Sequence, residues 1–478
     1  NEVQTADNTA VNGKSEGRGD YTFSVIRDAE ITVSLAGSNG PVAPGDTITY
    51  TTSACNLRGA QNVAAISLNG SPASVYVIGL IPTNTSLKSG QTFPVGTLYS
   101  IDPHTVAPTA ATWTSVQPAL SSIKRIAFAS GATLAPAACT TSYIYDVEVE
   151  PTITSTSTIV NIADAFGTNG AGNTITDQSG DNTPSQGSGN GGTVPVGGSA
   201  GTGIPLVTPV TITVAVLNGP DNAPDATGPT SDDDDYTNKA GNTGLAGVSA
   251  GGTTTAPNVV IFDNTVLNAG DANDNFVLTT PTIPSGVTVE ISKDGGATWT
   301  AAPVVTGTLA PGDTFDYKVR VTIPTGAAAY SAFATVIRAT SANDPTETND
   351  TIDRVYTGFV VLSKSQSLVN GSGVGSTTTP APGAVIEYKV DYTNIASTGG
   401  TGSITLNATN FVITEDGSAN SNNWATWTNY QSGETDSLGA TIVVGTSGSG
   451  VAQAKYTSTL PTLAAGASGT LTIKRIIK

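Results

Sequence analysis

Apolar residues alternate with threonine, serine or other polar residues along most of the chain, and this period of two constrains the fold more than any other feature. Clear runs are Tyr21–Val25, Glu30–Leu35, Val210–Leu217 and Gly469–Ile473. A strand with one face on a core and the other in water has this pattern, and β-branched residues favour it. Helical periodicity is almost absent. We therefore predict an all-β protein.

Turn dipeptides separate these runs. Each combines Asn or Asp with Gly, residues that tolerate the positive φ angles that two-residue hairpins require. The dipeptides are Asn39-Gly40, Asn69-Gly70, Asn218-Gly219, Asp294-Gly295 and Asp416-Gly417. We expect such turns to join neighbouring strands into hairpins.

A short internal repeat divides the chain. The sequence APGDTITY at Ala43–Tyr50 recurs as APGDTFDY at Ala310–Tyr317 and as APGAVIEY at Ala381–Tyr388. Each copy reads as a Pro-Gly turn followed by a strand whose alternate side chains point inward. The copies predict a tandem array of three immunoglobulin-like β-sandwich modules.

The module boundaries follow from composition. Residues 165–204 are rich in Gly, Ser, Asn and Thr, which is typical of a flexible linker or a long surface loop. A new strand pattern begins near Val355. The predicted parts are an N-terminal extension over 1–28, a sandwich with a disulfide over 29–164, the linker or loop over 165–204, and further sandwiches over 205–354 and 355–478.

Charge and histidine content argue against several function classes. The 478 residues include 19 Lys and Arg against 37 Asp and Glu, a net charge of −18 that disfavours a nucleic-acid partner. Because His104 is the single histidine, most His-based triads and His-rich metal centres are ruled out. We predict no catalytic residues and no enzyme activity. A glycosidase, however, needs only two carboxylates, so a secreted glycan-active enzyme remains as a third hypothesis, after the two that are given below.

The cysteines point to an oxidising compartment. Cys55 and Cys139 are an even pair, which in a secreted protein usually forms a disulfide; the alternative is two buried thiols. The sequence has no methionine and begins at Asn1, so we expect a secretory signal peptide to have been removed. No run approaches the 18 apolar residues of a membrane helix. These features predict an extracellular or cell-surface protein without a transmembrane segment.

The turn-strand repeats resemble a family of bacterial cell-surface modules, the immunoglobulin-like conserved repeat domain (domain of unknown function number eleven). Its pattern is a lysine-containing strand, a Pro-Gly turn, a strand ending in tyrosine and an asparagine-containing strand. The matching pieces are Lys364, Ala381–Gly383, Tyr388 and Asn394, and in the first module Pro44–Asp46, Tyr50 and Asn56. The middle module departs, because Val321–Pro324 stands where the asparagine strand belongs. The resemblance implies a structural or adhesive role and no catalytic residues.

Two acidic segments are candidate cation sites. Asp271, Asn273, Asp274 and Asn275 follow the D-x-N-D-N order that resembles the inter-domain calcium linker of cadherins. Hard oxygen ligands of this kind suit calcium; the alternative is a polar turn between strands. Asp232–Asp235 concentrates negative charge, and we expect it to be a solvated loop rather than a neutralised site.

Two aromatic motifs have structural and functional readings. Ser292–Trp299 matches the S-x-D-x-G-x-x-W pattern of an Asp-box, and we expect a non-catalytic hairpin in which Asp294 bonds turn amides. Trp424 and Trp427 could form a platform for sugar rings, but on a strand their odd spacing places them on opposite faces, so we expect one of them in the core.

These observations favour a secreted structural subunit that forms an extracellular filament or a surface layer with other copies of itself. The alternative is an adhesin that binds carbohydrate or protein. Tyr21, Phe23 and Val25 share one face of a strand pattern that precedes the first module. A lone amphipathic strand must pair with a sheet edge, either its own module's or that of a neighbouring subunit, which would generate an open fibre.

Overall fold

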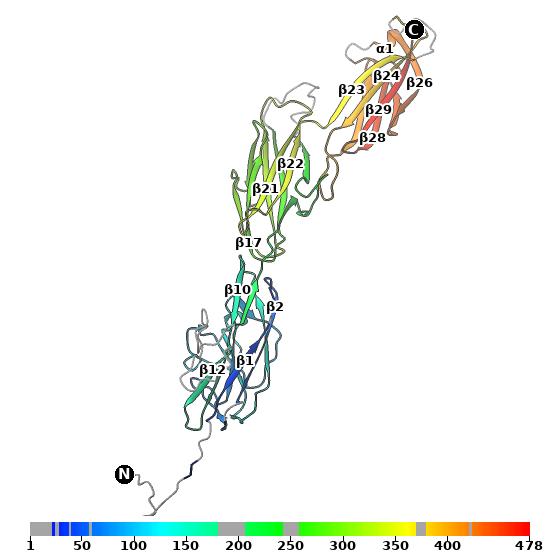
Figure 1. The fold of residues 1–478 in the computed structure, drawn as a ribbon. Helices are drawn as coiled ribbons and strands as arrows, with labels where there is room; N and C mark the ends of the chain where they lie inside the picture. The colour runs from blue at the N-terminus through cyan, green and yellow to red at the C-terminus, as the bar shows by residue number, and fades with distance from the viewer. Residues whose placement is uncertain are drawn as a thin grey trace, which may run out of the picture. The chain divides into compact units, whose positions relative to one another are not determined.

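The computed structural model describes residues 22–23, 28–37, 40–56, 60–179, 206–241, 258–369, 379–419 and 423–478. The fold is all-β and consists of β-sandwich modules, as predicted (Figure 1). The chain forms two compact units, Asn1–Thr211 and Ile212–Lys478. The first unit is the first module. The sheets divide the second unit into a middle module, residues 212–356, and a third module, residues 357–478.

The first module packs a four-stranded sheet against a larger one. The four-stranded sheet has the order β1 (Thr32–Ala36), β2 (Thr47–Cys55), β9 (Tyr143–Val149), β5 (Thr85–Leu87). The seven-stranded sheet has the order β6 (Leu98–Ser100), β7 (Arg125–Ala129), β4 (Tyr76–Leu80), β11 (Ala163–Thr168), β3 (Val63–Ala64), β8 (Thr133–Leu134), with β12 (Thr174–Gln178) on β11. A ribbon of β10 (Ser157–Asn161) and β13 (Leu206–Val210) and a 3₁₀ turn at Leu120–Ser122 complete the described part.

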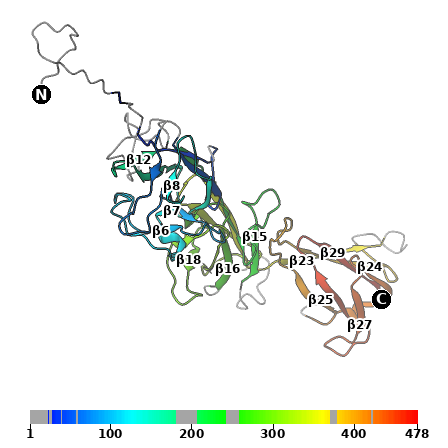
Figure 2. The ribbon, with the colours of Figure 1, turned by 90° about the horizontal axis from the view of Figure 1, so that it is seen from below.

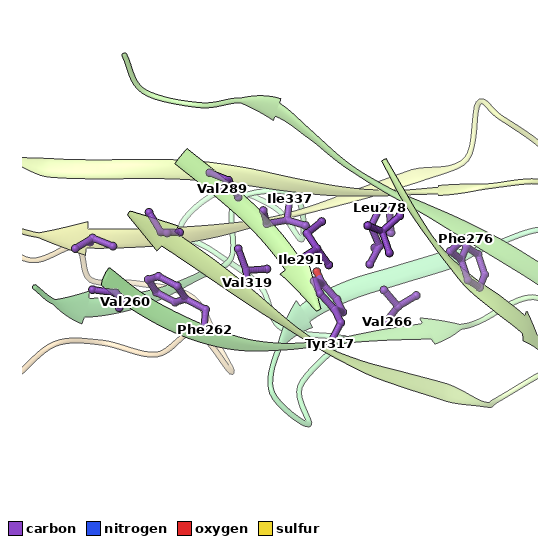
Figure 3. Packing of buried hydrophobic residues seen from close by; sticks show 14 of the residues in the cluster. Val260, Phe262, Val266, Phe276, Leu278, Val289, Ile291, Tyr317, Val319 and Ile337 are labelled. Carbon is purple, nitrogen blue, oxygen red and sulfur yellow. The ribbon is translucent and has the colours of Figure 1, made fainter. Parts of the chain in front are cut away.

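The middle module is a sandwich of four and five strands. One sheet has the order β14 (Val216–Pro220), β16 (Asn258–Asn268), β20 (Thr314–Ile323), β18 (Thr288–Ser292). The other has the order β15 (Tyr236–Ala240), β22 (Thr348–Tyr356), β21 (Ala332–Ser341), β17 (Asp274–Thr282), β19 (Val304–Leu309). Alternate residues of these strands fill the core between the sheets, and Figure 3 shows Phe262, Phe276 and Ile337 there, with the hydroxyl of Tyr317 among them.

The third module is a smaller sandwich. Its sheets have the orders β23 (Val360–Leu368), β24 (Val385–Asn394), β29 (Ser468–Ile477), β26 (Thr428–Asp436) and β25 (Ala408–Asp416), β28 (Lys455–Leu463), β27 (Thr441–Gly445). A single helical turn, α1 (Trp424–Trp427), precedes β26. The edge strand β23 is exposed over Leu362–Ser367.

Hydrogen bonds of the β type join the middle and third modules. Tyr236 on β15 accepts a bond from the amide of Ile404 (2.7 Å), and Asn238 donates to the carbonyl of Ile404 (2.9 Å), so a loop of the third module adds to the β15 edge (Figure 2). Gly400 in this loop has a φ of +84°, and a Cβ there would lie 1.9 Å from the carbonyl oxygen of Thr227. Only glycine allows this approach.

A buried asparagine ends the second strand of the four-stranded sheet in each module. Asn56, Asn268 and Asn394 are at most 1% exposed. Each Nδ2 donates to two backbone carbonyls, for Asn394 those of Leu406 (2.9 Å) and Leu463 (3.2 Å). Each Oδ1 accepts a backbone amide, for Asn394 that of Ala396 (3.0 Å). We call these residues the strand-end asparagines; each ties loop backbone that would otherwise lack a partner.

The middle module was expected to lack the asparagine of the repeat pattern, but it too has a strand-end asparagine. Its asparagine is Asn268 at the end of β16, not a residue near Val321–Pro324. The third APG motif of the chain precedes β24, the second strand of its module, as the first precedes β2. In the middle module the motif precedes β20, a late strand. The same turn-strand sequence therefore occupies different places in the topology.

The observed module limits differ from the expected ones in three places. Residues 165–178, expected in the linker, form most of β11 together with β12, with Phe166 and Ile175 in the core. Leu206–Val210 is β13 and pairs with β10 of the first module, so it does not open the middle module. Val355 lies within β22, so the third module begins after it. Residues 180–205 lie outside the described part of the chain.

Among the described residues no helix has both the length and the apolar character needed to cross a membrane.

Candidate functional site

The candidate assembly segment, Tyr21–Val25, is only partly described. Tyr21 and Val25 lie outside the described residues, whereas Phe23 is described and is 82% exposed. The first strand of the module, β1, begins at Thr32, and the chain is already packed at Asp28, which accepts a bond from Asn169 (2.7 Å). Phe23 is thus a large apolar side chain that does not pack on the described part of its own module.

The expected disulfide is present. Cys55 at the end of β2 and Cys139 are bonded, and they close a loop with a sequence separation of 84. The bridge lies beside the strand-end asparagine Asn56, whose amide and carbonyl bond the backbone of Ala138 and Ala137. It therefore cross-links the end of β2 to the segment that contains Cys139, and its role is structural.

The expected calcium segment is tied into the fold. Asp274, 4% exposed, accepts bonds from the amides of Ala342 and Asn343 (each 3.2 Å) and from the hydroxyl of Ser341 (2.5 Å). Asp271 accepts the amide of Thr213 (2.8 Å). The side chain of Asn343 donates to the Asn273 carbonyl (2.8 Å), and Asn275 accepts the amide of Ala342. Calcium binding by Asp271, Asn273, Asp274 and Asn275 stays a prediction, in competition with these protein donors.

The acidic run Asp232–Asp235 is divided between solvent and core. This corrects the expectation that it is a wholly solvated loop. Asp234 closes a turn by accepting the amides of Thr230 and Ser231, and Asp233 accepts the amide of Asp350 (3.0 Å). Asp235, by contrast, is fully buried and accepts a bond from the hydroxyl of Thr351. Burial raises the pKa of Asp235 to about 8, and the hydrogen bond from Thr351 opposes this shift.

Asp353 is a second buried carboxylate that the sequence-based reasoning missed. It is fully buried on β22, and Asn264 of the facing sheet donates to its Oδ2 at 3.0 Å. Burial raises the pKa of Asp353 to about 8. The signal was available, because Asp353 occupies an inward position in the alternation Asn349, Thr351, Asp353, Val355, where an apolar residue is expected.

The Asp-box forms the expected hairpin. Asp294 accepts bonds from the amide of Thr298 (2.9 Å) and the hydroxyl of Ser292 (2.7 Å), and Gly296, with φ of +100°, donates to Ser292. The side-chain and backbone bonds from Thr298 lower the pKa of Asp294. Trp299 packs under the guanidinium of Arg320, whose centre lies 4.5 Å from the ring. The motif has a structural role.

The two tryptophans of the third module separate as expected, but on a helical turn rather than a strand. Asn423 caps α1 by accepting the amide of Thr426 (3.2 Å), which gives this segment its helical geometry. Trp424 is buried against Tyr388 and Tyr456, and Trp427 is 68% exposed. A polar cavity of about 180 Å³ nearby is lined by Gly417, Ser418, Asn423, Ala425, Ser447, Ser449, Val451 and Ala454. Because this lining has no aromatic ring, carbohydrate binding stays a prediction.

His104 lies in a structural setting. Its Nε2 contacts the backbone carbonyl of Lys124 at 3.0 Å, and burial lowers its pKa. The neighbouring buried Arg125 donates to the carbonyls of Asp102, Pro103, His104 and Val106 and so holds this loop. In the part of the chain that the structure describes, no group of three or more His, Cys, Asp or Glu side chains is placed to hold a metal ion.

Comparison with known families finds one match. A domain of unknown function, DUF7925, matches residues 21–187, which comprise the candidate assembly segment and most of the first module. The conserved repeat domain that the motifs resemble is not matched. No curated protein matches the chain.

Solved structures give distant similarities. The CupB6 tip adhesin from Pseudomonas aeruginosa is 10% identical, with 70% of this chain and 99% of that chain covered and a TM-score of 0.26. BcpA, the major pilin subunit of Bacillus cereus, is 10% identical, with coverage of 66% and 60% and a TM-score of 0.22. A putative membrane anchored protein from Corynebacterium diphtheriae is 10% identical, with coverage of 95% and 88% and a TM-score of 0.21. TM-scores this low carry no weight for fold or function, which rest on the geometry above.

Proposed function

We propose that this chain is a secreted structural subunit of an extracellular filament or surface layer, in which copies of the chain join through β-strand contacts. The observation that carries the proposal is the exposed Phe23 in a strand-patterned segment that precedes β1. Tyr21, Phe23 and Val25 alternate with Thr22 and Ser24, so one face of a strand formed here would be apolar. Such a segment is stabilised only when its backbone and its apolar face are both satisfied by a sheet.

The neighbouring subunit supplies that sheet in this proposal. Main-chain hydrogen bonds along a sheet edge give affinity, and alternate side chains in pockets fix the register. A contact between one end of a subunit and a different surface of the next is head-to-tail, and it propagates into an open fibre unless the rotation between subunits closes a ring.

The construction of each module suits a load-bearing subunit. The disulfide Cys55–Cys139 cross-links the first module, and β-type hydrogen bonds at β15 join the middle module to the third. A buried asparagine ties the strand end in every module. These features stabilise a fixed framework, which supports a structural role above an enzymatic one.

Substitution of Phe23 by lysine is expected to abolish or strongly reduce assembly. Burial of a phenylalanine contributes about 1.5–3 kcal/mol per contact, so its loss raises the concentration needed for assembly by roughly tenfold or more. Negative-stain microscopy and sedimentation of the purified variant measure this effect.

Thr22→Lys is the matched control. Thr22 is also exposed and gains the same charge, but its side chain lies on the opposite face of the strand pattern. We expect this variant to assemble like the natural protein. Equal assembly of both variants and the natural protein would remove strand exchange from the proposal.

A further inference from the structure

The inner faces of the middle module hold two carboxylates that have no ion pair among the described residues. Asp235 and Asp353 are both 0% exposed. Among the described residues, the ion pairs of this module involve Asp263, Glu290 and Asp350 instead. A buried charge is costly unless a counter-charge or a metal ion compensates it.

Other polar side chains converge on Asp353 from three strands. The register places Thr237 of β15 and Thr335 of β21 directly opposite Asp353 of β22, one on each side. Asn264 of β16 reaches Asp353 from the facing sheet through its Nδ2, at 3.0 Å. Side chains directly opposite in an antiparallel pair, as Thr335 and Asp353 are, have Cβ atoms about 4.5–5.5 Å apart. Asp353 thus stands at the centre of a polar row.

Asp235 joins this row through Thr351. The hydroxyl of Thr351 donates to Asp235, and Thr351 lies two residues before Asp353 on the same inward face of β22. Tyr317 lies opposite Asn264 in the register. Burial raises the pKa of Tyr317 well above its ordinary value, and the charges of Asp353 and Asp235 add to this shift. The two carboxylates, Asn264 and the threonines therefore form one cluster, which we call the core oxygen cluster.

Five side-chain oxygens of the cluster have no hydrogen-bond partner within the described residues. They are Oδ2 of Asp235, Oδ1 of Asp353, Oδ1 of Asn264 and the hydroxyl oxygens of Thr237 and Thr335. All five residues are at most 1% exposed. Three of the five atoms, the two carboxylate oxygens and the amide oxygen, can only accept a hydrogen bond unless a carboxyl is protonated, whereas the two threonine hydroxyls can also donate.

Lys239, whose charge acts on Asp353, is engaged elsewhere. Lys239 donates to the carbonyl of Ile261 (2.7 Å), lies 3.9 Å from Asp263 and covers the ring of Phe262 at 5.2 Å. Its charge lowers the pKa of Asp353, whereas that of Asp263 raises it. Lys239 thus moderates the field at the cluster without bonding to either buried carboxylate.

We propose that the core oxygen cluster is a binding site for a hard divalent cation, calcium, between the two sheets of the middle module. All five available ligands are oxygens, and two carboxylates balance a charge of +2. Calcium accepts six to eight oxygen ligands in flexible geometry, so water completes the shell. This site is distinct from Asp271–Asn275 and independent of how subunits assemble.

The test measures calcium binding by the full chain and by asparagine variants. Addition of millimolar calcium to chelator-treated protein is expected to raise the Tm of the middle module by roughly 5–10 °C, because a ligand bound only by the folded state stabilises it. Terbium luminescence excited through tyrosine gives a second readout, since Tyr317 lies beside the cluster. Asp353→Asn and, separately, Asp235→Asn are expected to abolish both signals.

Asp271→Asn is the matched control, because Asp271 belongs to the other candidate segment. We expect this variant to keep the full calcium response. A calcium response that is lost in Asp271→Asn but kept in Asp353→Asn would overturn the proposal and place calcium at the other segment. A Tm that is unchanged by calcium but rises on acidification would also overturn the proposal, because the buried carboxyls would then bind protons and no calcium.

Discussion

In calcium-free buffer at pH 7, Asp353→Asn is expected to raise the free energy of unfolding of the middle module by up to about 4 kcal/mol. Asp353 is fully buried, and burial raises its pKa from 3.8 to about 8. At pH 7 the carboxyl of Asp353 is ionised in the unfolded chain. In the folded state it must either keep its proton or bear a buried charge, and both cost free energy relative to the unfolded state. A difference of about three pH units corresponds to roughly 4 kcal/mol. Asparagine is neutral at every pH and removes this free-energy cost.

The pH dependence has a definite sign. Because the folded-state pKa values of Asp235 and Asp353 lie above the ordinary value, the stability they contribute is complete below about pH 4 and is lost as the pH rises toward 8. The groups that face them are Lys239 and Asp263 near Asp353, and Asp232, Asp234 and Asp353 near Asp235. The advantage of Asp353→Asn should therefore be largest near pH 8 and vanish near pH 4.

Calorimetry of the natural protein and two variants measures this effect. Asp350→Asn is the control, because Asp350 is on the same strand but points outward and binds the guanidinium of Arg338 at 2.7 Å. Loss of this partly exposed ion pair should cost about 1 kcal/mol or less at pH 7. If Asp353→Asn were destabilised to the same extent or more at every pH, our account of the buried carboxylates would be wrong.

Asn394→Ala is expected to lower the free energy of unfolding of the third module by about 2–4 kcal/mol. Asn394 is fully buried and serves the carbonyls of Leu406 and Leu463 and the amide of Ala396. Alanine leaves these backbone groups without their partner, at about 1–3 kcal/mol for each group that water cannot reach, and it leaves a cavity. Amide hydrogen exchange of peptides from β24 and β29 measures the change in this module alone.

Asn429→Ala is the control for this substitution. Asn429 is in the same module, on β26, but it is exposed. Surface substitutions of this kind usually change stability by less than about 0.5 kcal/mol. Equal protection of β24 and β29 in the two variants would show that the strand-end asparagine has no special role.

The fold class could be predicted from the sequence because period-two alternation depends only on which face of a strand is buried. Tyr388, Val390 and Tyr392 alternate on β24 and all three enter the core. The linker prediction was wrong over residues 165–178 because β11 and β12 contain small and polar residues. Thr176 and Asp177 are buried there, and Asp177 accepts a bond from the amide of Val33 (2.7 Å), which composition alone does not reveal.

The alternation along β22 could have indicated Asp353, whereas the burial of Asp235 was beyond reach for a different reason. The charge density of Asp232–Asp235 indicates solvent, but Asp235 immediately precedes β15 and turns inward as that strand begins. Its neighbour Thr351 is 116 residues away in sequence, and the two meet only because β15 pairs in parallel with β22. A pattern within one segment cannot predict a contact that depends on which strands become neighbours.

Binding of a peptide tests the central claim, that the segment before β1 adds as a strand to another copy of the chain. The measurement is fluorescence anisotropy of a labelled peptide of residues 16–28 with the protein that lacks residues 1–28. Strand addition predicts saturable binding by this peptide and at least roughly tenfold weaker binding when it carries Phe23→Lys, with Thr22→Lys binding as the natural sequence does. Absence of binding, or equal binding of all three peptides, would contradict the account.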